Sequence, residues 1–359
     1  MTTTLGLDTK FENQTQTIGP VDWRFGYYGN IGKRLFELAS CKPLPDDIGT
    51  WPAAIVPLIK NLYAGQDRPL PKLEKKGTIR KTKAGKEKLA VVGFTGGRDS
   101  VAITCMLMAE GYKVHLLHLS GLNRSHYYEK DNCRAIAEYM DVPLTIRHLK
   151  FRGTSGDLSN RLRNQFIMCQ QLDFAEEIGG TAITQGNHQA DNLGNITNWI
   201  WFADAQENYQ AYQKAFKGNI EFRTSLCVNP SMVYAKIKEL RPDLLTKLGS
   251  CVHPHMYRNL RRKQTKTKYG IDLLPYRCGI CYKCCWEYLI FCEMTDLYGK
   301  PDQKYAMHCL DVVREKWHYF YNEDLRPINR VETLKAIIDQ KYVSTPTIIK
   351  WANESEAKK

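Results

Sequence analysis

The central part of the chain alternates between short apolar runs and segments in which apolar residues recur every three or four positions. The run at 89–94 has no polar residue, and the runs at 113–119, 144–149 and 181–185 combine apolar and β-branched residues with a few polar ones, so all four predict strands. The segment 101–108, between the first two runs, has a helical period. A strand, a helix and a second strand in this order predict a βαβ unit and therefore an α/β fold with parallel strands.

The motif Thr95-Gly96-Gly97-Arg98-Asp99-Ser100 directly follows the first predicted strand. Two adjacent glycines allow positive φ, so that successive N–H groups can form an anion-binding nest, and the following helix adds a positive dipole end. The side chains offer hydroxyl donors, a guanidinium for phosphate oxygens and a carboxylate that can hold Mg²⁺ or the loop itself. We predict that ATP binds over this loop, from Phe94 to Ser100. A tight strand-to-helix turn without a ligand is the alternative.

A second glycine-containing segment, 26–34 (GYYGNIGKR), superficially resembles a Walker A loop. Its glycine offset is wrong, and Arg34 stands where Ser or Thr is required. We therefore predict an ordinary turn there.

Three evenly spaced cysteines, Cys278, Cys281 and Cys284, indicate a metal site. Thiolates at this CxxCxxC spacing can converge on one ion, and Gly279 lets the loop wrap around it. A fourth ligand is needed, for which the candidates are Cys251, Cys285, His253 and His255. Four soft ligands in a closed sphere favour structural Zn²⁺, at a distance from any reaction, and an iron–sulfur cluster is the alternative.

Composition places the chain in a reducing compartment. It has 12 cysteines, and its first residues, MTTTLGLDTKFENQTQT, are polar and unlike a signal peptide, so we expect a cytoplasmic protein. No apolar run approaches the roughly 18 residues needed to span a bilayer, so we expect no membrane association. The net charge of +13 suits a polyanionic substrate or partner, such as ATP or nucleic acid.

Helical patterns flank the α/β part. They occur within 20–65 and again within 305–359, and the Lys-rich tract 72–88 between the first of them and the sheet is predicted to be a linker. The sequence thus predicts four parts, which are a helical extension with a basic linker at 1–87, an α/β domain at 88–250, a metal-binding segment at 251–298 and a helical tail at 299–359.

A second basic stretch, 258–268 (RNLRRKQTKTK), lies between Cys251 and the other three cysteines. Accessible Lys and Arg attract phosphates, and the flanking Tyr257 and Tyr269 could stack on bases. We predict contact with nucleic acid through 258–268 and 72–88, with a solvated loop as the alternative. The sequence leaves open whether the protein forms a homodimer.

Several segments in a fixed order resemble the PP-loop ATP pyrophosphatases, whose signature is Ser-Gly-Gly-x-Asp-Ser at the end of the first strand. Thr95 replaces the first serine and keeps a hydroxyl. Within this superfamily, residues 88–298 are most similar to the 7-cyano-7-deazaguanine synthases of queuosine-precursor biosynthesis. The segments that carry this resemblance are Ser120-Gly121, Ala135-Ile136-Ala137, Arg163-Asn164, Phe174-Ala175-Glu176, 181–191 (TAITQGNHQAD), 230–240 and Ser250-Cys251 before the CxxCxxC motif.

The resemblance implies a doubly wound, mostly parallel α/β sheet of the Rossmann-like kind and an adenylation reaction. A substrate carboxylate or carbonyl oxygen would attack the α-phosphate of ATP, pyrophosphate would leave, and ammonia, an amine or a sulfur donor would displace AMP. The predicted catalytic residues are Arg98, Asp99, Ser100 and Arg163. Arg98 and Arg163, together with the loop at 95–100 and Mg²⁺, are expected to neutralise charge on the departing pyrophosphate.

The resemblance also assigns further ligands. His118, Ser120 and Asn164 are predicted to hold adenine or ribose, with packing inside a strand as the alternative for His118. Cys251 occupies the Ser-Cys position of the family and becomes the predicted fourth Zn²⁺ ligand.

The acceptor half departs from the synthase pattern. The family's Tyr-Gly-Gln, Gly-Arg-Asn and Tyr-Ser-Gly-Tyr-Pro-Asp are here Ser120-Gly121-Leu122, Leu162-Arg163-Asn164 and 192–197 (NLGNIT). We therefore expect a different acceptor, which is a small heterocycle, a nucleic-acid base or a protein terminus. Three functions stay open, namely an adenylating carbon–nitrogen ligase of this type, a PP-loop enzyme that modifies a base in tRNA or DNA, and a zinc-stabilised nucleotide- or nucleic-acid-binding protein without catalysis.

Overall fold

The structure is a computed structural model that describes residues 11–14, 26–40, 46–57, 59–60, 72–120, 126–148, 156–186, 218–223, 230–249, 255–294, 302–320 and 346–357, together with residues 69, 216, 251 and 331. By their contacts, the described residues form two compact units. The first lies within Met1–Thr95, Ile103–Asn187 and Asp204–Thr224, and the second within Gly96–Ala102, His188–Ala203 and Ser225–Lys359. The four-part division made from the sequence stays a prediction.

A parallel sheet of six strands forms the centre of the first unit, in the order β1-β6-β5-β4-β7-β8. The four runs predicted as strands match four of these strands to within one residue at either end. The six strands of the sheet are β1 (Phe11–Gln14), β4 (Leu89–Gly93), β5 (Lys113–Ser120), β6 (Leu144–His148), β7 (Ala182–Gln185) and β8 (Glu221–Arg223), of which β4, β5, β6 and β7 were predicted.

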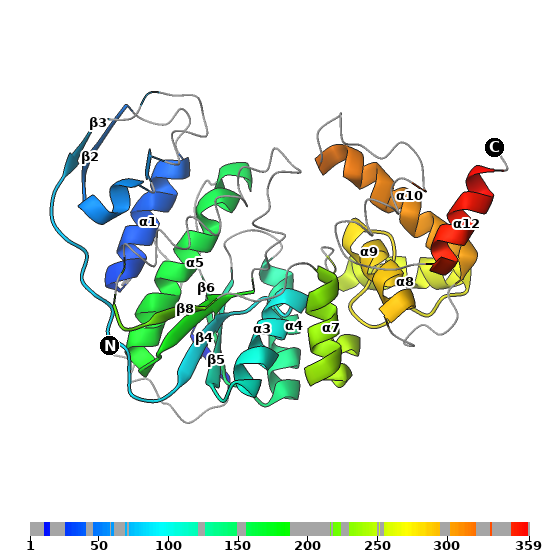
Figure 1. Cartoon of the computed structure of the whole chain (residues 1–359), viewed down its shortest axis with the longest axis horizontal. Helices are drawn as coiled ribbons and strands as arrows, with labels where there is room; N and C mark the ends of the chain where they lie inside the picture. The colour runs from blue at the N-terminus through cyan, green and yellow to red at the C-terminus, as the bar shows by residue number, and fades with distance from the viewer. Residues whose placement is uncertain are drawn as a thin grey trace. The chain divides into compact units, whose positions relative to one another are not determined.

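The strand order shows that the sheet is doubly wound, as predicted. The chain passes from β4 through β5 to β6 in one direction and then returns to the other side of β4 to form β7. The returning helix α5 (Gly156–Ile178) covers one face of the sheet, and α3 (Arg98–Ala109) and α4 (His126–Met140) lie on the other (Figure 1). This reversal creates a topological switch point between β4 and β7, and ligands of open α/β sheets bind outside the carboxyl ends of such strands.

Three layers, which are the sheet, α5 and α1, enclose the core of the first unit on the face of the sheet that α5 covers. Apolar side chains of the sheet, including Val91, Leu117 and Ile183, pack against α5, and α5 in turn packs against Tyr28, Ile31 and Leu35 of α1 (Tyr27–Ser40). β2 (Asp47–Trp51) and β3 (Lys72–Lys75) form a separate parallel pair.

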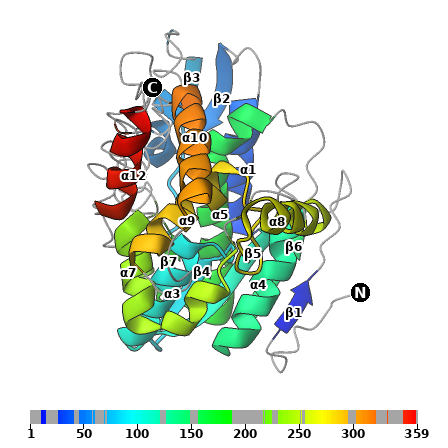
Figure 2. The same ribbon diagram turned by 90° about the vertical axis from the view of Figure 1, so that its right-hand side faces the viewer.

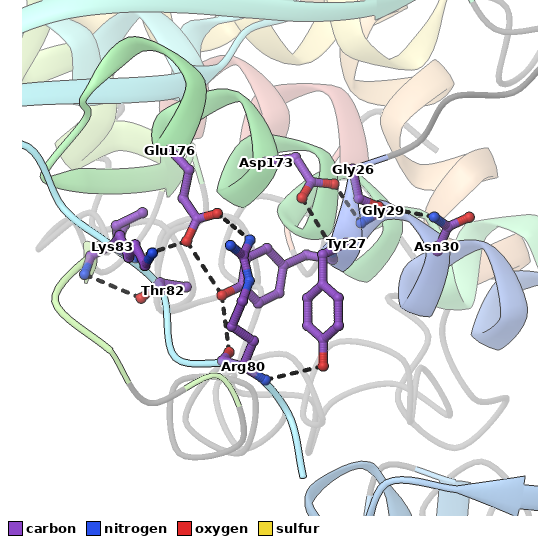
Figure 3. A network of polar contacts seen from close by, with 11 residues as sticks. Gly26, Tyr27, Gly29, Asn30, Arg80, Thr82, Lys83, Asp173 and Glu176 are labelled. Carbon is purple, nitrogen blue, oxygen red and sulfur yellow. Dashed lines mark hydrogen bonds and ion pairs between the residues drawn. The ribbon is translucent and has the colours of Figure 1, made fainter. Parts of the chain in front are cut away.

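The turn predicted at 26–34 is wrong, because α1 begins at Tyr27. The helix starts there because Asp173 of α5 accepts hydrogen bonds from the N–H group of Tyr28 (3.0 Å) and from that of Gly29 (2.6 Å). Figure 3 shows Asp173 beside Gly29. A carboxylate at this position binds N–H groups that a helix leaves unused in its first turn.

The basic tract 72–88 differs from the predicted linker. It forms β3 and then packs against the first unit, where Glu176 of α5 accepts hydrogen bonds from the guanidinium of Arg80 (2.5 Å) and the backbone N–H of Lys83 (2.8 Å; Figure 3). Gly85 donates to the carbonyl of Gly180 at 3.3 Å. These partners come from distant parts of the sequence, so composition alone could not reveal them.

The second unit consists of helices in its described part, namely α7 (Pro230–Leu240), the 3₁₀ helix η4 (Pro242–Thr246), α8 (His255–Tyr269), α9 (Tyr282–Met294), α10 (Gln303–Phe320) and α12 (Pro346–Glu356). α10 packs against both α9 and α12, as Figure 2 shows. The helical tail is thereby confirmed at α10 and α12. The stretch 258–268 lies in α8, so its alternative description as a loop is wrong.

Across the part of the chain that the structure describes, no helix has the length and the apolar run that crossing a bilayer requires.

Candidate ATP-binding loop and metal centre

The loop at 95–100, which we call the phosphate loop because it is predicted to bind the phosphates of ATP, lies at the carboxyl end of β4, beside the switch point. β4 ends at Gly93 and α3 begins at Arg98, and between them Gly96 has a φ of +67°, which favours glycine. The carbonyl of Gly97 accepts hydrogen bonds from Val101 N–H and from the hydroxyl of Ser100, both at 3.0 Å. Ser100 is buried and closes the first turn of α3, and phosphate binding by the backbone of the loop stays a prediction.

The charged side chains of the loop contact each other. Arg98 Nε lies 3.3 Å from Asp99 Oδ1, and both side chains are partly exposed. The guanidinium of Arg98 also lies 5.5 Å from the ring centroid of Tyr234, within the range of a cation–π contact. Sequence reasoning missed Tyr234, because nothing near it in the sequence indicates this contact with the loop.

His118 supports the end of β4 from the neighbouring strand. It is buried, and its Nδ1 lies 2.8 Å from the carbonyl oxygen of Phe94, to which Nδ1 must donate because a carbonyl can only accept. The thiol of Cys133 lies 3.4 Å from the same nitrogen. The burial of His118 and its contacts within the sheet match the alternative prediction, in which this side chain packs inside a strand. Its contact with a nucleotide, and that of the buried Ser120 at the end of β5, stay predictions.

Arg163 and Asn164 lie on α5, which begins at Gly156. Their side chains lie outside the described part of the structure. Their predicted roles therefore stay predictions.

Gln171 of α5 holds the two strands at the switch point together, and sequence reasoning missed it. Its fully buried side-chain amide donates to the carbonyls of Val91 in β4 (3.2 Å) and Thr184 in β7 (2.7 Å). A Cβ on Gly93 would lie 3.3 Å from Gln171 Nε2, so glycine gives the amide room. A polar residue amid the apolar positions of α5 was the available signal.

Four cysteines form a site that can hold a metal ion. The sulfurs of Cys251, Cys278, Cys281 and Cys284 all lie within 4.8 Å of one another, and the last three residues are buried. Cys278 Sγ and Cys284 Sγ are 3.9 Å apart, too far for a disulfide and close to the edge of about 3.8 Å of a tetrahedron with Zn–S bonds of about 2.3 Å. The donor set therefore fits Zn²⁺.

Among the other candidates for fourth ligand, Cys285 points elsewhere, with its sulfur 3.6 Å from the carbonyl of Gly279 and in contact with Cys309. The side chains of His253 and His255 lie outside the described part of the structure.

The loop around Cys278 has the geometry of a metal-binding knuckle. Its sulfur lies 3.5 Å from Ile280 N and 3.3 Å from Cys281 N, both of which donate to it. Hydrogen bonds from Cys251 and the other thiols lower the pKa of Cys281, which favours the thiolate that a metal binds. Gly279 has a φ of +78°, and a Cβ there would lie 2.7 Å from Thr265 Oγ1 of α8.

Residues that directly precede the metal-binding segment contact the loop at 95–100, whereas the expectation that the metal lies at a distance from the reaction stays a prediction. Gly249, two residues before Cys251, donates its N–H to the carbonyl of Gly96 at 3.2 Å. The sequence could not show this, because the two glycines are far apart along the chain.

Residues 89–159 match the family model described as queuosine biosynthesis protein QueC. The chain is similar to QueC over this stretch. The match runs from β4 through the phosphate loop to β6 and the start of α5, and it confirms the resemblance to PP-loop enzymes and to 7-cyano-7-deazaguanine synthase. It supports the use of ATP in general, without defining the acceptor. A search of curated proteins found no similar sequence.

Proposed function

We propose that the protein is an ATP-dependent adenylating enzyme of the 7-cyano-7-deazaguanine synthase type. It converts ATP to AMP and pyrophosphate while activating a carboxylate or carbonyl oxygen for attack by ammonia or an amine. The observation that carries this proposal is the glycine loop at the carboxyl end of β4, at a topological switch point and within the stretch that matches QueC.

The loop residues have distinct roles in the proposed reaction. Backbone N–H groups at the start of α3 bind phosphate oxygens, and Arg98 neutralises charge as the bond between the α-phosphorus and the bridging oxygen breaks. The acceptor oxygen forms the new bond to phosphorus, and nitrogen attack then releases AMP. Asp99 is the residue that would hold Mg²⁺, which supplies further positive charge to the phosphates. We propose Arg163 as the second cationic side chain that neutralises charge on the departing pyrophosphate.

The four cysteines are proposed to bind one Zn²⁺ with a structural role. Four thiolates leave no open position for a substrate, which is typical of structural zinc sites. Bound zinc would hold the 278–284 knuckle together with the segment that precedes Cys251.

An assay of AMP and pyrophosphate formation with a panel of carboxylates and heterocyclic acceptors tests the activity. We expect Gly97→Val and Asp99→Asn to abolish both products while the proteins stay folded. The proposal is overturned if the folded Gly97→Val variant forms AMP at the parent rate.

A second candidate is a PP-loop enzyme whose acceptor is a nucleic-acid base. On α8, Lys263 and Lys268 are exposed, and the guanidinium of Arg261 lies 4.7 Å from the ring centroid of the exposed Tyr257. Exposed cations beside an aromatic ring suit a phosphate backbone with stacked bases. Asp272 offsets part of this charge through ion pairs with Lys266 and Arg262. The tract 72–88 adds further exposed lysines.

A further inference from the structure

A fully buried ion pair lies next to the cysteine knuckle. Arg277 Nε is 2.5 Å from Glu287 Oε2, and the two side chains are 1% and 0% exposed. Arg277 directly precedes Cys278, and Glu287 lies on α9 shortly after Cys284. The rest of the guanidinium donates to the carbonyls of Pro275 (2.9 Å) and Leu245 (3.3 Å).

Tyr234 of α7 connects this ion pair to the phosphate loop. Its hydroxyl donates to the second oxygen of Glu287 at 2.8 Å, and Arg98 forms a hydrogen bond with the same hydroxyl. Burial and the neighbouring Glu287 raise the pKa of Tyr234 well above its usual value, so the hydroxyl keeps the proton that it donates. A continuous line of polar contacts thus runs from Arg277 through Glu287 and Tyr234 to Arg98.

A backbone connection runs beside this line. The carbonyl of Leu245 accepts from Arg277, and a few residues later Gly249 N–H donates to the carbonyl of Gly96. The residues next to the cysteine cluster therefore reach the phosphate loop twice, once through side chains at Arg98 and once through the backbone at Gly96.

A gain in folding stability does not readily explain why Arg277 and Glu287 form a buried ion pair. Removing two charges from water is expensive, and buried pairs can often be replaced by apolar residues without loss of stability. What the pair does provide is a fixed acceptor for Tyr234. A fixed Tyr234 limits the rotamers of Arg98, whose long side chain would otherwise have to be ordered when a ligand binds.

We propose that Tyr234 and Glu287 are positioning residues that set the Arg98 guanidinium for the phosphate chain of a nucleoside triphosphate, and that Arg277 ties this arrangement to the metal-binding knuckle. The inference rests on the proposed function, because it takes the 95–100 loop as the ATP site. It adds a second role to the cysteine segment, which then organises the phosphate site as well as the fold.

The test uses Tyr234→Phe, which keeps the ring beside Arg98 and removes the hydroxyl. Its matched control is Tyr288→Phe, another buried tyrosine, whose hydroxyl accepts from the backbone of Asp302 at 3.2 Å. We expect Tyr234→Phe to raise the Kd for MgATP about 10- to 100-fold, the range for a hydrogen bond to a charged group, while Tyr288→Phe binds like the parent. Metal content, measured by elemental analysis, should match the parent in both variants.

A double-mutant cycle separates positioning from a general loss of stability. If Tyr234 acts through Arg98, adding Tyr234→Phe to an Arg98→Ala background should change the Kd for MgATP less than twofold. A full additional loss in that background would overturn the inference, as would a Tyr234→Phe variant that binds MgATP like Tyr288→Phe. Failure of the parent protein to bind MgATP at all would instead overturn the proposed function.

Discussion

The carboxylate of Asp173, in α5, accepts a 2.6 Å hydrogen bond from the backbone N–H of Gly29 in the first turn of α1 (Figure 3). The two residues are separated by 144 positions in the sequence, and their contact fixes where α1 begins on the surface of α5. Burial raises the pKa of Asp173 to about 6, although the hydrogen bonds from Gly29 and Tyr28 oppose that shift. The burial of this carboxyl group therefore makes the stability of the first unit depend on pH.

We predict that Asp173 lowers stability as the pH rises from about 4 to about 6. Its folded pKa lies above the unfolded value of 3.8, so the folded state binds more protons than the unfolded state in this window. The effect is at most about 3 kcal/mol over the window, and less because the residue is only partly buried. Asp173→Asn should remove this slope in urea unfolding measured at several pH values.

His115 changes the stability with pH in the opposite direction, so the contribution of Asp173 must be measured as a difference between two proteins that both contain His115. Burial lowers its pKa to about 4, so this histidine contributes stability that is lost as the pH falls through 6.5 toward 4. The measured quantity is therefore the difference between parent and Asp173→Asn profiles. Identical profiles for the two proteins would contradict the prediction.

Gln171→Leu should lower the free energy of unfolding by about 1–3 kcal/mol, because two buried strand carbonyls would lose the amide that binds them. Its neighbour Gln170 is the matched control, since it is also buried and its Nε2 has no hydrogen-bond partner among the described residues. Gln170→Leu should be neutral or stabilising. Equal losses for the two variants in urea unfolding would show that the bridge at the switch point contributes nothing.

The protein should contain one zinc per chain, and Cys281→Ser should abolish it. Metal binding to four thiolates contributes directly to folding, so the variant should also have a clearly lower thermal midpoint. Cys285→Ser is the control, because that sulfur lies against the carbonyl of Gly279 and outside the cluster. Elemental analysis that finds iron, or zinc retained by Cys281→Ser, would count against the site.

The basic face of α8 should bind nucleic acid in a salt-dependent way. The log–log slope of affinity against salt should be roughly −0.7 to −0.9 for each neutralised phosphate, and joint replacement of Arg261, Lys263 and Lys268 by Ser should flatten it by about two to three phosphates. Replacement of Lys113, which pairs with Glu87 in the first unit, should leave it unchanged. A parent protein that binds neither RNA nor DNA at low salt would leave the small-molecule acceptor as the better proposal.

The sequence alone determined the features that depend on neighbours along the chain. Short runs rich in apolar and β-branched residues located β4, β5, β6 and β7, because such residues pack well on the faces of a buried sheet. The glycine pair marked the loop before α3, since glycine readily takes the positive φ found at Gly96. The spacing of Cys278, Cys281 and Cys284 likewise predicted three ligands from one short segment.

The tertiary structure decided what depends on residues that fold together from distant positions. It brought Cys251, which only the family resemblance had selected, to the other three cysteines. It placed Gly249 on the carbonyl of Gly96, and Tyr234 between Glu287 and Arg98. It also turned the expected turn at 26–34 into a helix, because the carboxylate that caps α1 comes from α5. A hydrogen bond or a metal ligand requires atoms a few ångströms apart, and for distant residues the folded chain alone brings those atoms together.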